Sequence, residues 1–512
     1  MIDNINLQKK TKTNKYLLKM KKNISTTKAI LLALCFAFPI VTFSQDGSLD
    51  NTFGVNGIVT TSFGPYTQAR LSDLAIQADG KIVVIGYFDN DLFSFNYRII
   101  RYNANGSLDN SFGNNGIVIP SYGMNPGLIG DHLKIQADGK ILVQSAGNLA
   151  RYNTNGSLDI TFGLDGIVTD YFNDFAIQAD GKIVITSAWS IKRYNTNGSL
   201  DATFGVDGIA TITPTPTVYG YLSNLAIQTD GKIIVNGYQA TNQSFILSRF
   251  NTNGSLDNTF GVAGIIYYDS NSGFDRDLVL AIQADGKIVS ILGNNGLPVQ
   301  KIARFNTNGI LNNTFGNFGV INPQLGGNAD LALQTDGKIV VVGYSNNNGQ
   351  DDFALNRFNT NGSLDNTLGV AGIITTSIGT ASYPNSVAIQ ADGKIVVAGR
   401  SIDGSGDVFQ SVFTIVRYNN NLTGDISESN TSSQISIYPN PFSNATTLKT
   451  NNIFENATFI VYNTLGEQVR KIDNISGQTF TFYRENLEQG IYFYQLKENN
   501  IIVSENKFVI TD

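Results

Sequence analysis

The chain has 512 residues, of which 51 are Gly and 11 are Pro; 15% are charged and 11% aromatic. Length alone would suggest three or four domains. The composition is too apolar for a disordered chain and too rich in Tyr, Phe and Gly for a helical one, which indicates an all-β protein. A single Cys and a single His exclude a disulfide framework, thiol catalysis and most metal sites.

The first 44 residues carry a basic region followed by an apolar run over residues 29–43. This order, ending in the small residue Ser44, is typical of a secretory signal peptide, which we assign to residues 1–44. Because the basic region before Met20 is long, Met20 is an alternative translation start. Cys35 falls in this segment, so the mature chain contains no Cys.

Charge is unevenly divided along the chain. Residues 1–44 hold eight Lys and one acid, which leaves 27 basic and 40 acidic residues in the remainder. An acidic protein repels phosphate backbones, so nucleic acid is excluded as a partner. No later segment approaches the apolar length of a membrane span, and we expect none in the mature chain.

Two motifs recur seven times each. The Asp-Gly pair of Ile-Gln-Ala-Asp-Gly-Lys-Ile (76–82) returns at spacings of 59, 42, 50, 55, 51 and 56 residues. The motif Asn-Gly-Ser-Leu-Asp-x-Thr-Phe-Gly is complete at 155–163, 197–205 and 253–261, with close variants from Asp46, Asn105, Asn308 and Asn361. A period in this range predicts a solenoid, an array or a propeller.

Short β-prone runs flank each Asp-Gly and Asn-Gly pair. Such pairs favour two-residue type I′ turns, so each unit is predicted to hold two hairpins, or about four antiparallel strands. A further apolar piece, Gly57-Ile58-Val59 and its equivalents, either extends or replaces the short fourth strand. Because the Ile-Val-Val runs are apolar on consecutive residues, both strand faces should be covered, as in the sheets of a β-propeller.

The repeated region begins in mid-unit at Asp46 and ends on the third strand of a unit at Asn419. The N-terminal fragment therefore supplies what the last unit lacks. We predict a seven-bladed β-propeller over residues 45–424, closed by a strand exchanged between the termini, which leaves no open sheet edge. An open superhelix is the alternative, and it would need capping repeats.

These repeats resemble the bacterial delta-60 repeat over about residues 46–424. The resemblance implies a β-propeller without an established biochemical activity, and it carries no catalytic residues to transfer.

Because strands alternate in direction, the Asp-Gly and Asn-Gly turns are expected on one face of the ring, here called the turn face. The connections that vary in length should lie on the opposite, variable-loop face, where binding sites are usually built. Aromatic residues there, interleaved with acids, suit a glycan; packing within their own loops is the alternative. The candidate ligand-binding residues are Trp189, Tyr219, Tyr221 and Tyr267, and Tyr171 and Tyr383 occupy similar connections.

Other candidate sites favour structural interpretations. The segment from Asn103 to Asp109 resembles a calcium loop, but its early ligands are Asn, so a plain hairpin turn with Asp109 accepting backbone N–H bonds is favoured. His132 lacks a second His or a Cys, which excludes a zinc site, and we interpret it as an ordinary loop residue. We expect no catalytic residue, metal or cofactor. Paired carboxylates for glycoside hydrolysis stay open, because acids are numerous on the variable-loop face.

After a linker at 425–434, residues 435–512 show short strands and turns that suggest a small β-sandwich. Their segments 438–442 (Tyr-Pro-Asn-Pro-Phe), 462–467 and 487–492 resemble the type A C-terminal sorting domain of the type IX secretion system. The resemblance implies that the type IX machinery exports the protein across the outer membrane, after Sec export, and leaves it secreted or on the cell surface.

The sequence thus predicts a secreted or cell-surface β-propeller that is more readily a binding scaffold, for a glycan or a protein, than an enzyme. Two alternatives stay open. One is an extracellular carbohydrate-active enzyme that uses carboxylates on the variable-loop face. The other is a structural surface or adhesion component.

Overall fold

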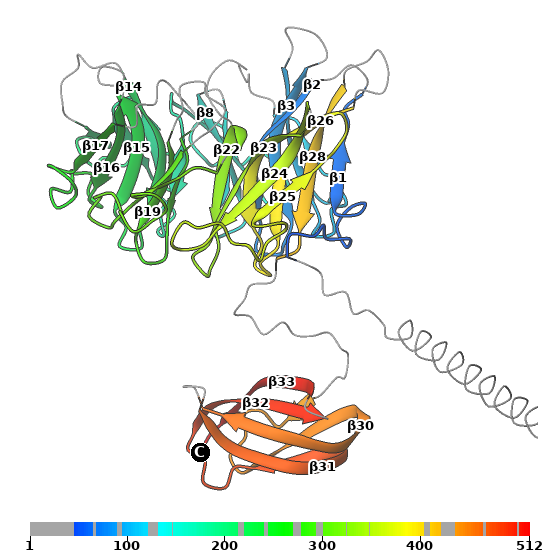
Figure 1. The fold of residues 1–512 in the computed structure, drawn as a ribbon. Helices are drawn as coiled ribbons and strands as arrows, with labels where there is room; N and C mark the ends of the chain where they lie inside the picture. The colour runs from blue at the N-terminus through cyan, green and yellow to red at the C-terminus, as the bar shows by residue number, and fades with distance from the viewer. Residues whose placement is uncertain are drawn as a thin grey trace, which may run out of the picture. The chain divides into compact units, whose positions relative to one another are not determined.

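The computed structural model in Figure 1 describes residues 46–64, 68–89, 95–120, 132–145, 147–212, 220–239, 244–269, 278–292, 301–323, 325–347, 349–403, 410–420, 436–463, 467–498 and 501–512. The expected signal peptide (1–44) and linker (425–434) lie outside the described residues. Contacts divide the chain into two units, Met1–Leu422 and Thr423–Asp512. Among the described residues, no helix is long and apolar enough to cross a membrane.

The first unit consists of seven four-stranded antiparallel sheets, the blades. In chain order they are β2 (Gln68–Ile76), β3 (Ile82–Asp89), β4 (Phe95–Tyr102) and β5 (Ile117–Val118); β6 (His132–Ile135), β7 (Ile141–Ser145), β8 (Asn148–Tyr152) and β9 (Ile167–Thr169); β10 (Phe175–Ile177), β11 (Ile183–Ser187), β12 (Ser190–Tyr194) and β13 (Ile209–Thr211); β14 (Gly220–Ile227), β15 (Ile233–Gln239), β16 (Ser244–Phe250) and β17 (Ile265–Asp269); β18 (Leu280–Ile282), β19 (Ile288–Leu292), β20 (Lys301–Phe305) and β21 (Val320–Ile321); β22 (Gly326–Leu333), β23 (Ile339–Asn347), β24 (Gln350–Phe358) and β25 (Ile373–Thr376); and β26 (Ala381–Ile389), β27 (Ile395–Asp403) and β28 (Gln410–Tyr418) with β1 (Ile58–Thr61).

The blades form a closed ring. The first strands of neighbouring blades contact one another in a complete circle, from β2 through β6, β10, β14, β18, β22 and β26 back to β2. These first strands are therefore innermost. The last blade takes its outer strand from the N-terminus, because β1 pairs antiparallel with β28. The predicted β-propeller with an exchanged terminal strand is confirmed.

The structure decides between the two possibilities for the fourth strand. Leu49 makes a single bridge to Tyr418, whereas Ile58–Thr61 pairs with β28 over four residues. The Gly-Ile-Val segments therefore replace the Ser-Leu-Asp segments as outer strands. Between the two, a tight turn reverses the chain at Asn56-Gly57, where both residues have positive φ.

The prediction of type I′ turns at the Asp-Gly pairs was wrong, and these turns occur at a different repeated position. At Asp79-Gly80 only the glycine has positive φ; Gly80 N donates to Gln77 O, and Gln77 N donates to Lys81 O. This is a three-residue loop, a type I turn followed by a left-handed glycine. The type I′ geometry, with both central residues left-handed, occurs instead at Asn56-Gly57 and its equivalents before the outer strands.

The second unit has five strands: β29 (Ser436–Tyr438), β30 (Ala445–Tyr462), β31 (Gln468–Tyr483), β32 (Gly490–Glu498) and β33 (Ile501–Ile510). They form one hydrogen-bonded network rather than two separate sheets. The 18-residue β30 pairs with β29 near its start and with β32 near its end, and register shifts interrupt its pairing with β31. One long, irregular sheet thereby encloses a core rich in aromatic residues, including Phe459, Phe482 and Phe508.

Candidate functional site

The turn face is built around seven equivalent arginines, one at the end of each third strand. Arg151 illustrates the arrangement: its Nε donates to Asp159 Oδ2 at 2.7 Å, and its guanidinium also donates to the carbonyl of Thr196 in the next blade. The guanidinium carbon lies 4.5 Å from the Phe162 ring centroid. Equivalent contacts to the next blade are made by Arg101, Arg193, Arg249, Arg304, Arg357 and Arg417. We call each set an arginine clasp.

The carboxylates of the clasps are held ionised. Asp159 also accepts from Lys140 Nζ at 2.8 Å and from the Thr161 hydroxyl. Burial alone would raise the pKa of Asp159, but the hydrogen bonds from Lys140, Thr161 and Arg151 hold it well below its usual range. The same balance lowers the pKa of Asp109, Asp257 and Asp365, the last to about 2. These acids are therefore structural.

One clasp is incomplete. Asn312 takes the place of the aspartate in the blade β18–β21, and Arg304 Nε is buried without a hydrogen-bond partner among the described residues. Lys287, whose equivalents bond the clasp aspartate, pairs instead with Asp285 of its own turn. Burial lowers the pKa of Arg304.

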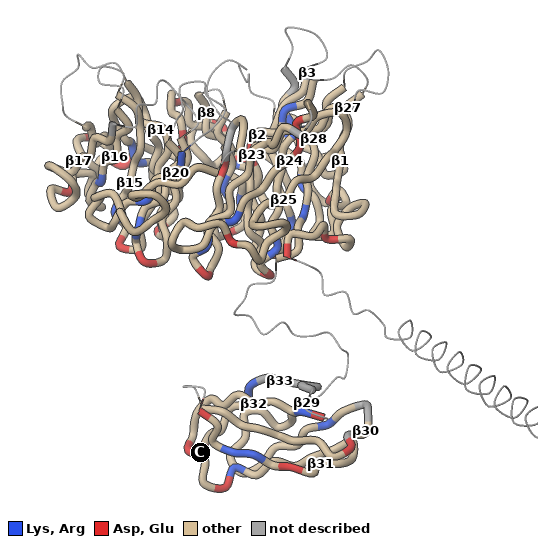
Figure 2. Tube along the Cα trace, in the orientation of Figure 1, with Lys and Arg blue, Asp and Glu red and all other residues tan. Residues whose placement is uncertain are grey.

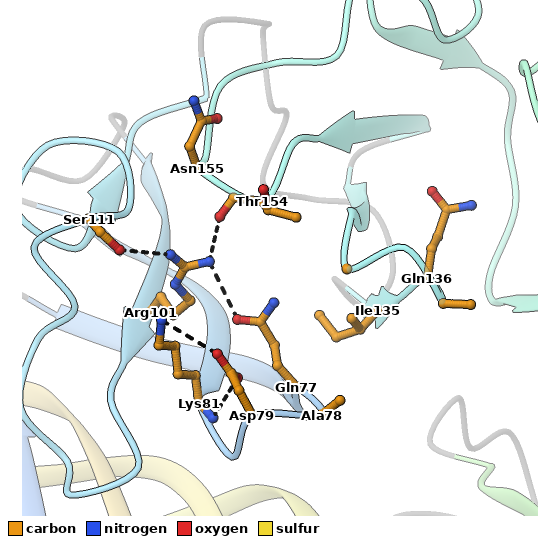
Figure 3. A pocket seen from close by; sticks show the side chains of 12 residues that line it. Gln77, Ala78, Asp79, Lys81, Arg101, Ser111, Ile135, Gln136, Thr154 and Asn155 are labelled. Atoms are coloured by element: carbon orange, nitrogen blue, oxygen red, sulfur yellow. Dashed lines mark hydrogen bonds and ion pairs between the residues drawn. The ribbon is translucent and has the colours of Figure 1, made fainter.

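A cleft of about 560 Å³ opens between the blades β2–β5 and β6–β9 (Figure 3). Gln77, Lys81 and Arg101 line it from one blade, and Gln136 and Thr154 line it from the next. Figure 2 shows acidic residues in turns along the lower edge of the blades. Because its arginine and lysine bond neighbouring carboxylates, the polar groups of the cleft serve the contact between blades.

Carboxylates also join the innermost strands. Asp73 Oδ2 accepts from Leu133 N of the next blade at 2.9 Å, and Asp330 Oδ2 accepts from Val387 N at 2.8 Å. Each lies at a register shift between the first and second strands of its blade, which frees backbone N–H groups. Burial raises the pKa of Asp330 to about 6, against the N–H bond from Val387 and with support from the charge of Asp73.

A lysine and a histidine stand beside these acids. Lys134 Nζ lies 3.9 Å from Asp174 Oδ1, and His132 Nδ1 lies 3.8 Å from Asp73 Oδ2. Burial lowers the pKa of Lys134, but the charges of Asp174, Asp73 and Asp330 more than offset this and raise it. His132 begins β6, so its interpretation as a loop residue was wrong: ring closure places it on an innermost strand.

Several predicted aromatic residues share one position at the variable-loop end of the innermost strands. In four blades, one residue lies three positions before the residue whose side chain bonds between neighbouring innermost strands. These four residues are Arg70, Tyr171, Tyr221 and Tyr383. Opposite them on the second strands stand Tyr87 across from Arg70, Tyr238 across from Tyr221 and Arg400 across from Tyr383. We call these seven side chains the inner rim.

Glycines on the second strands position the inner rim. A Cβ added to Gly86 would lie 2.4 Å from Arg70 O, and one added to Gly399 would lie 2.1 Å from Tyr383 O. Only glycine admits so close an approach of the neighbouring strand. Gly-Tyr or Gly-Arg on the second strand, at 86–87, 237–238, 343–344 and 399–400, was a sequence signal for these positions, and the arginines were missed.

The remaining candidates are dispersed. Trp189, between β11 and β12, lies against Gly220 beside Tyr221, since a Cβ on Gly220 would lie 2.4 Å from its ring. Tyr267 is exposed on the outer strand β17, opposite Ile246, whereas Tyr268 packs on Phe305. Tyr219 lies outside the described residues. The structure thus brings Trp189 and Tyr221 together and separates Tyr267 from them.

The loop that resembled a calcium site is a hairpin turn. Asn105 Oδ1 accepts from Ser107 N, and Asp109 Oδ1 accepts from Ser111 N. In the part of the chain that the structure describes, no group of three or more His, Cys, Asp or Glu residues is arranged to hold a metal ion.

Two family models match the chain. The "Domain of unknown function (DUF5122) beta-propeller" matches six times, at residues 77–112, 136–162, 178–204, 228–260, 334–368 and 390–427. The blade without a match is β18–β21, which also carries the incomplete clasp. The "Secretion system C-terminal sorting domain" matches residues 436–511. The chain therefore carries DUF5122 β-propeller repeats followed by a type IX C-terminal sorting domain, as the motifs predicted.

Comparison with curated protein sequences found no match. Among solved structures, the polysaccharide lyase Uly1 is 10% identical with a TM-score of 0.41, over 67% of this chain and 89% of that one. A protein of unknown function from Dyadobacter fermentans is 10% identical (TM-score 0.37; 71% and 100%), and a gluconolactonase of Xanthomonas campestris is 11% identical (0.33; 55% and 83%). Likeness at this level assigns no activity.

Proposed function

We propose that the mature protein is a secreted or surface-displayed scaffold that binds an extracellular glycan or protein through the variable-loop face of its propeller. The sorting domain supports a secreted or cell-surface location. A signal peptide at residues 1–44 and Sec export complete this route.

One observation carries the binding role: the polar residues that repeat from blade to blade are used to hold blades together, whereas the inner rim differs from blade to blade. The clasp arginines and aspartates bond one another. The inner rim instead presents Arg70 and Tyr171 exposed, with Tyr221 and Tyr383 half-buried. Binding residues are found disproportionately at variable positions carried by a rigid scaffold.

The experiment is a glycan array and a protein pull-down with the mature chain. Trp189 is the only Trp, and it lies beside Tyr221, so its fluorescence reports ligands on the variable-loop face. We expect a saturable change in emission with a bound ligand. Silence on the array and in the pull-down would argue for the structural or adhesion alternative, which self-association would support.

The enzyme alternative is less well supported. The described carboxylates on the innermost strands, Asp73 and Asp330, accept backbone N–H bonds from neighbouring strands, which accounts for them without catalysis. Release of reducing ends from a bound polysaccharide, lost on Asp330→Asn but not on Lys301→Gln, which changes an exposed residue at the start of β20, would instead establish an enzyme.

A further inference from the structure

Two arginines of the inner rim lie on blades that meet at the ring closure. Arg70 on β2 and Tyr383 on β26 occupy equivalent positions, and these two innermost strands contact each other. Arg400 lies directly across from Tyr383, with its guanidinium carbon 5.0 Å from the Tyr383 ring centroid. Tyr87 lies directly across from Arg70.

Neither guanidinium has an ion pair or a hydrogen bond with the described residues. The clasp arginines show the contrast, because six of the seven have a buried aspartate at 2.7–2.8 Å. Arg70 is exposed and Arg400 half-buried. Residues 45–512 hold more acids than bases, yet neither arginine has a carboxylate partner among the described residues.

The two charges act on each other. Burial, and next the positive charge of Arg70, lower the pKa of Arg400. The nearby carboxylate of Asp351 is already engaged, since it accepts from the Tyr383 hydroxyl at 2.9 Å and from Asn346 Nδ2 at 2.8 Å. An incoming anion would relieve this repulsion.

A tyrosine lies directly across from each arginine, Tyr87 from Arg70 and Tyr383 from Arg400. Tyr344 and Tyr383 lie edge to face with their centroids 5.5 Å apart, and Tyr87 and Tyr97 lie tilted at the same distance. Rings of this kind offer flat apolar surfaces beside polar groups, which suit the apolar faces of a sugar. Arginine in turn holds a planar carboxylate or a sulfate with two parallel N–H bonds.

We propose that Arg70 and Arg400, with Tyr87, Tyr344 and Tyr383, form a binding site for an acidic glycan, in which the arginines hold a carboxylate or sulfate group and the tyrosines contact the sugar ring. This proposal rests on the proposed binding function and names its ligand class. A glycan fits better than an acidic peptide because the tyrosines provide ring-sized surfaces next to both charges.

The test measures binding of the mature chain to polygalacturonate (carboxylate), dextran sulfate (sulfate ester), neutral dextran and poly-glutamate. We expect binding to at least one acidic polysaccharide and none to dextran. Arg70→Gln and Arg400→Gln should each weaken binding about tenfold, as for loss of a charged hydrogen bond. Arg400→Lys should recover only part of the affinity that Arg400→Gln loses, because an ammonium group cannot make two parallel hydrogen bonds to one carboxylate or sulfate.

A matched control separates the site from general charge. Lys301 is exposed at the start of a third strand, on the same face but away from the inner rim, so Lys301→Gln removes one positive charge there. The affinity of the Lys301→Gln variant for the acidic polysaccharide should change less than about twofold, because salt screens an exposed charge that lies away from the site. Thermal melting of each variant checks that it folds. If Arg400→Gln is unstable because Arg400 is half-buried, the exposed Arg70→Gln carries the binding test alone.

The outcomes are distinct. If the protein binds dextran sulfate and polygalacturonate equally, the site recognises negative charge on a sugar. If it prefers one of them, the site recognises that polymer's acidic group, a sulfate ester or a carboxylate. Binding of neutral glycans alone, or equal loss in Lys301→Gln and Arg70→Gln, would overturn the proposal while leaving the proposed scaffold function. Tighter binding of poly-glutamate than of any glycan would replace the ligand class with an acidic protein.

Discussion

At the scale of single residues, the arginine clasp explains why the Asn-Gly-Ser-Leu-Asp motif recurs. Each aspartate neutralises a buried guanidinium that bonds the next blade, so the motif is a device for joining blades. A buried arginine without its partner would be costly, because its charge would stay uncompensated.

Removing an arginine tests this interpretation. Arg151→Ala removes one charged donor from buried Asp159, which keeps its bonds from Lys140 and Thr161, and should cost about 2–3 kcal/mol of unfolding free energy. Arg304→Ala, in the blade that lacks the aspartate, breaks no such ion pair and should cost at least about 1 kcal/mol less. Denaturant unfolding of the two variants measures the difference. Equal losses would mean that the ion pair contributes little.

The reverse change should stabilise the protein. Asn312→Asp supplies Arg304 Nε with the carboxylate that the other clasps have, and we expect a gain of about 1.5 kcal/mol. The side chain of Asn306, which now accepts from Asn312 Nδ2, can turn its amide to donate instead. The gain should appear as a higher melting temperature; an unchanged or lower one would contradict it.

At the scale of elements, β1 joins the two ends of the repeated region. It pairs with β28 at residues 58–61, and Arg417 Nε donates to Asp50 at 2.8 Å. The Arg357 clasp likewise takes Asp46 from the N-terminal fragment and Asn420 from the end of the array. Both contacts depend on ring closure.

A cross-link between these strands should therefore stabilise the ring. Thr60 and Thr414 lie directly opposite each other, and residues 45–512 contain no Cys to compete. The pair Thr60→Cys and Thr414→Cys, oxidised, should raise the unfolding free energy by about 2–4 kcal/mol. The reduced form of the same variant is the control. Failure to form the bond under mild oxidation would argue against the exchanged strand.

At the scale of the whole molecule, the clasps predict acid lability. Their aspartates have lowered pKa values in the folded state, so the unfolded state binds more protons as the pH falls. Their stabilisation is full above about pH 4 and is lost below it. Asp330 acts oppositely: its pKa of about 6 makes stability fall slightly as the pH rises from about 4 to 6.

Denaturant unfolding at about five pH values between pH 2 and neutrality measures how the unfolding free energy depends on pH. We expect a steep rise in unfolding free energy up to about pH 4. Asp201→Asn should reduce that slope, since it removes one of the lowered carboxylates. A profile without a rise in the acid range would contradict the role of the clasps.

The sorting domain predicts the fate of the protein in the cell. Deletion of residues 435–512 should leave the propeller in the periplasm, because the type IX machinery would have no domain to act on. Cell fractionation with an antibody against the propeller measures this, and Arg70→Gln is a control that should be exported normally. Normal surface export of the truncated chain would refute the assignment.

Much of this protein could be predicted from its sequence because its repeats are local. The period, the strand-forming runs and the glycine turns lie within single units, and they determined seven blades, the exchanged strand and the sorting tail. Local sequence also misled: Asp79-Gly80 suggested a two-residue turn, but the backbone hydrogen bonds close a three-residue loop.

The tertiary structure alone decided which side chains meet. Six clasp arginines bond a main-chain carbonyl in the following blade, and Arg357 bonds the side chain of Asn420. The inner rim joins Arg70 near the start of the array to Tyr383 and Arg400 near its end. No spacing in the sequence encodes these contacts, because they depend on seven blades closing a ring. Ring closure makes neighbours of residues from opposite ends of the repeats, and the candidate site lies there.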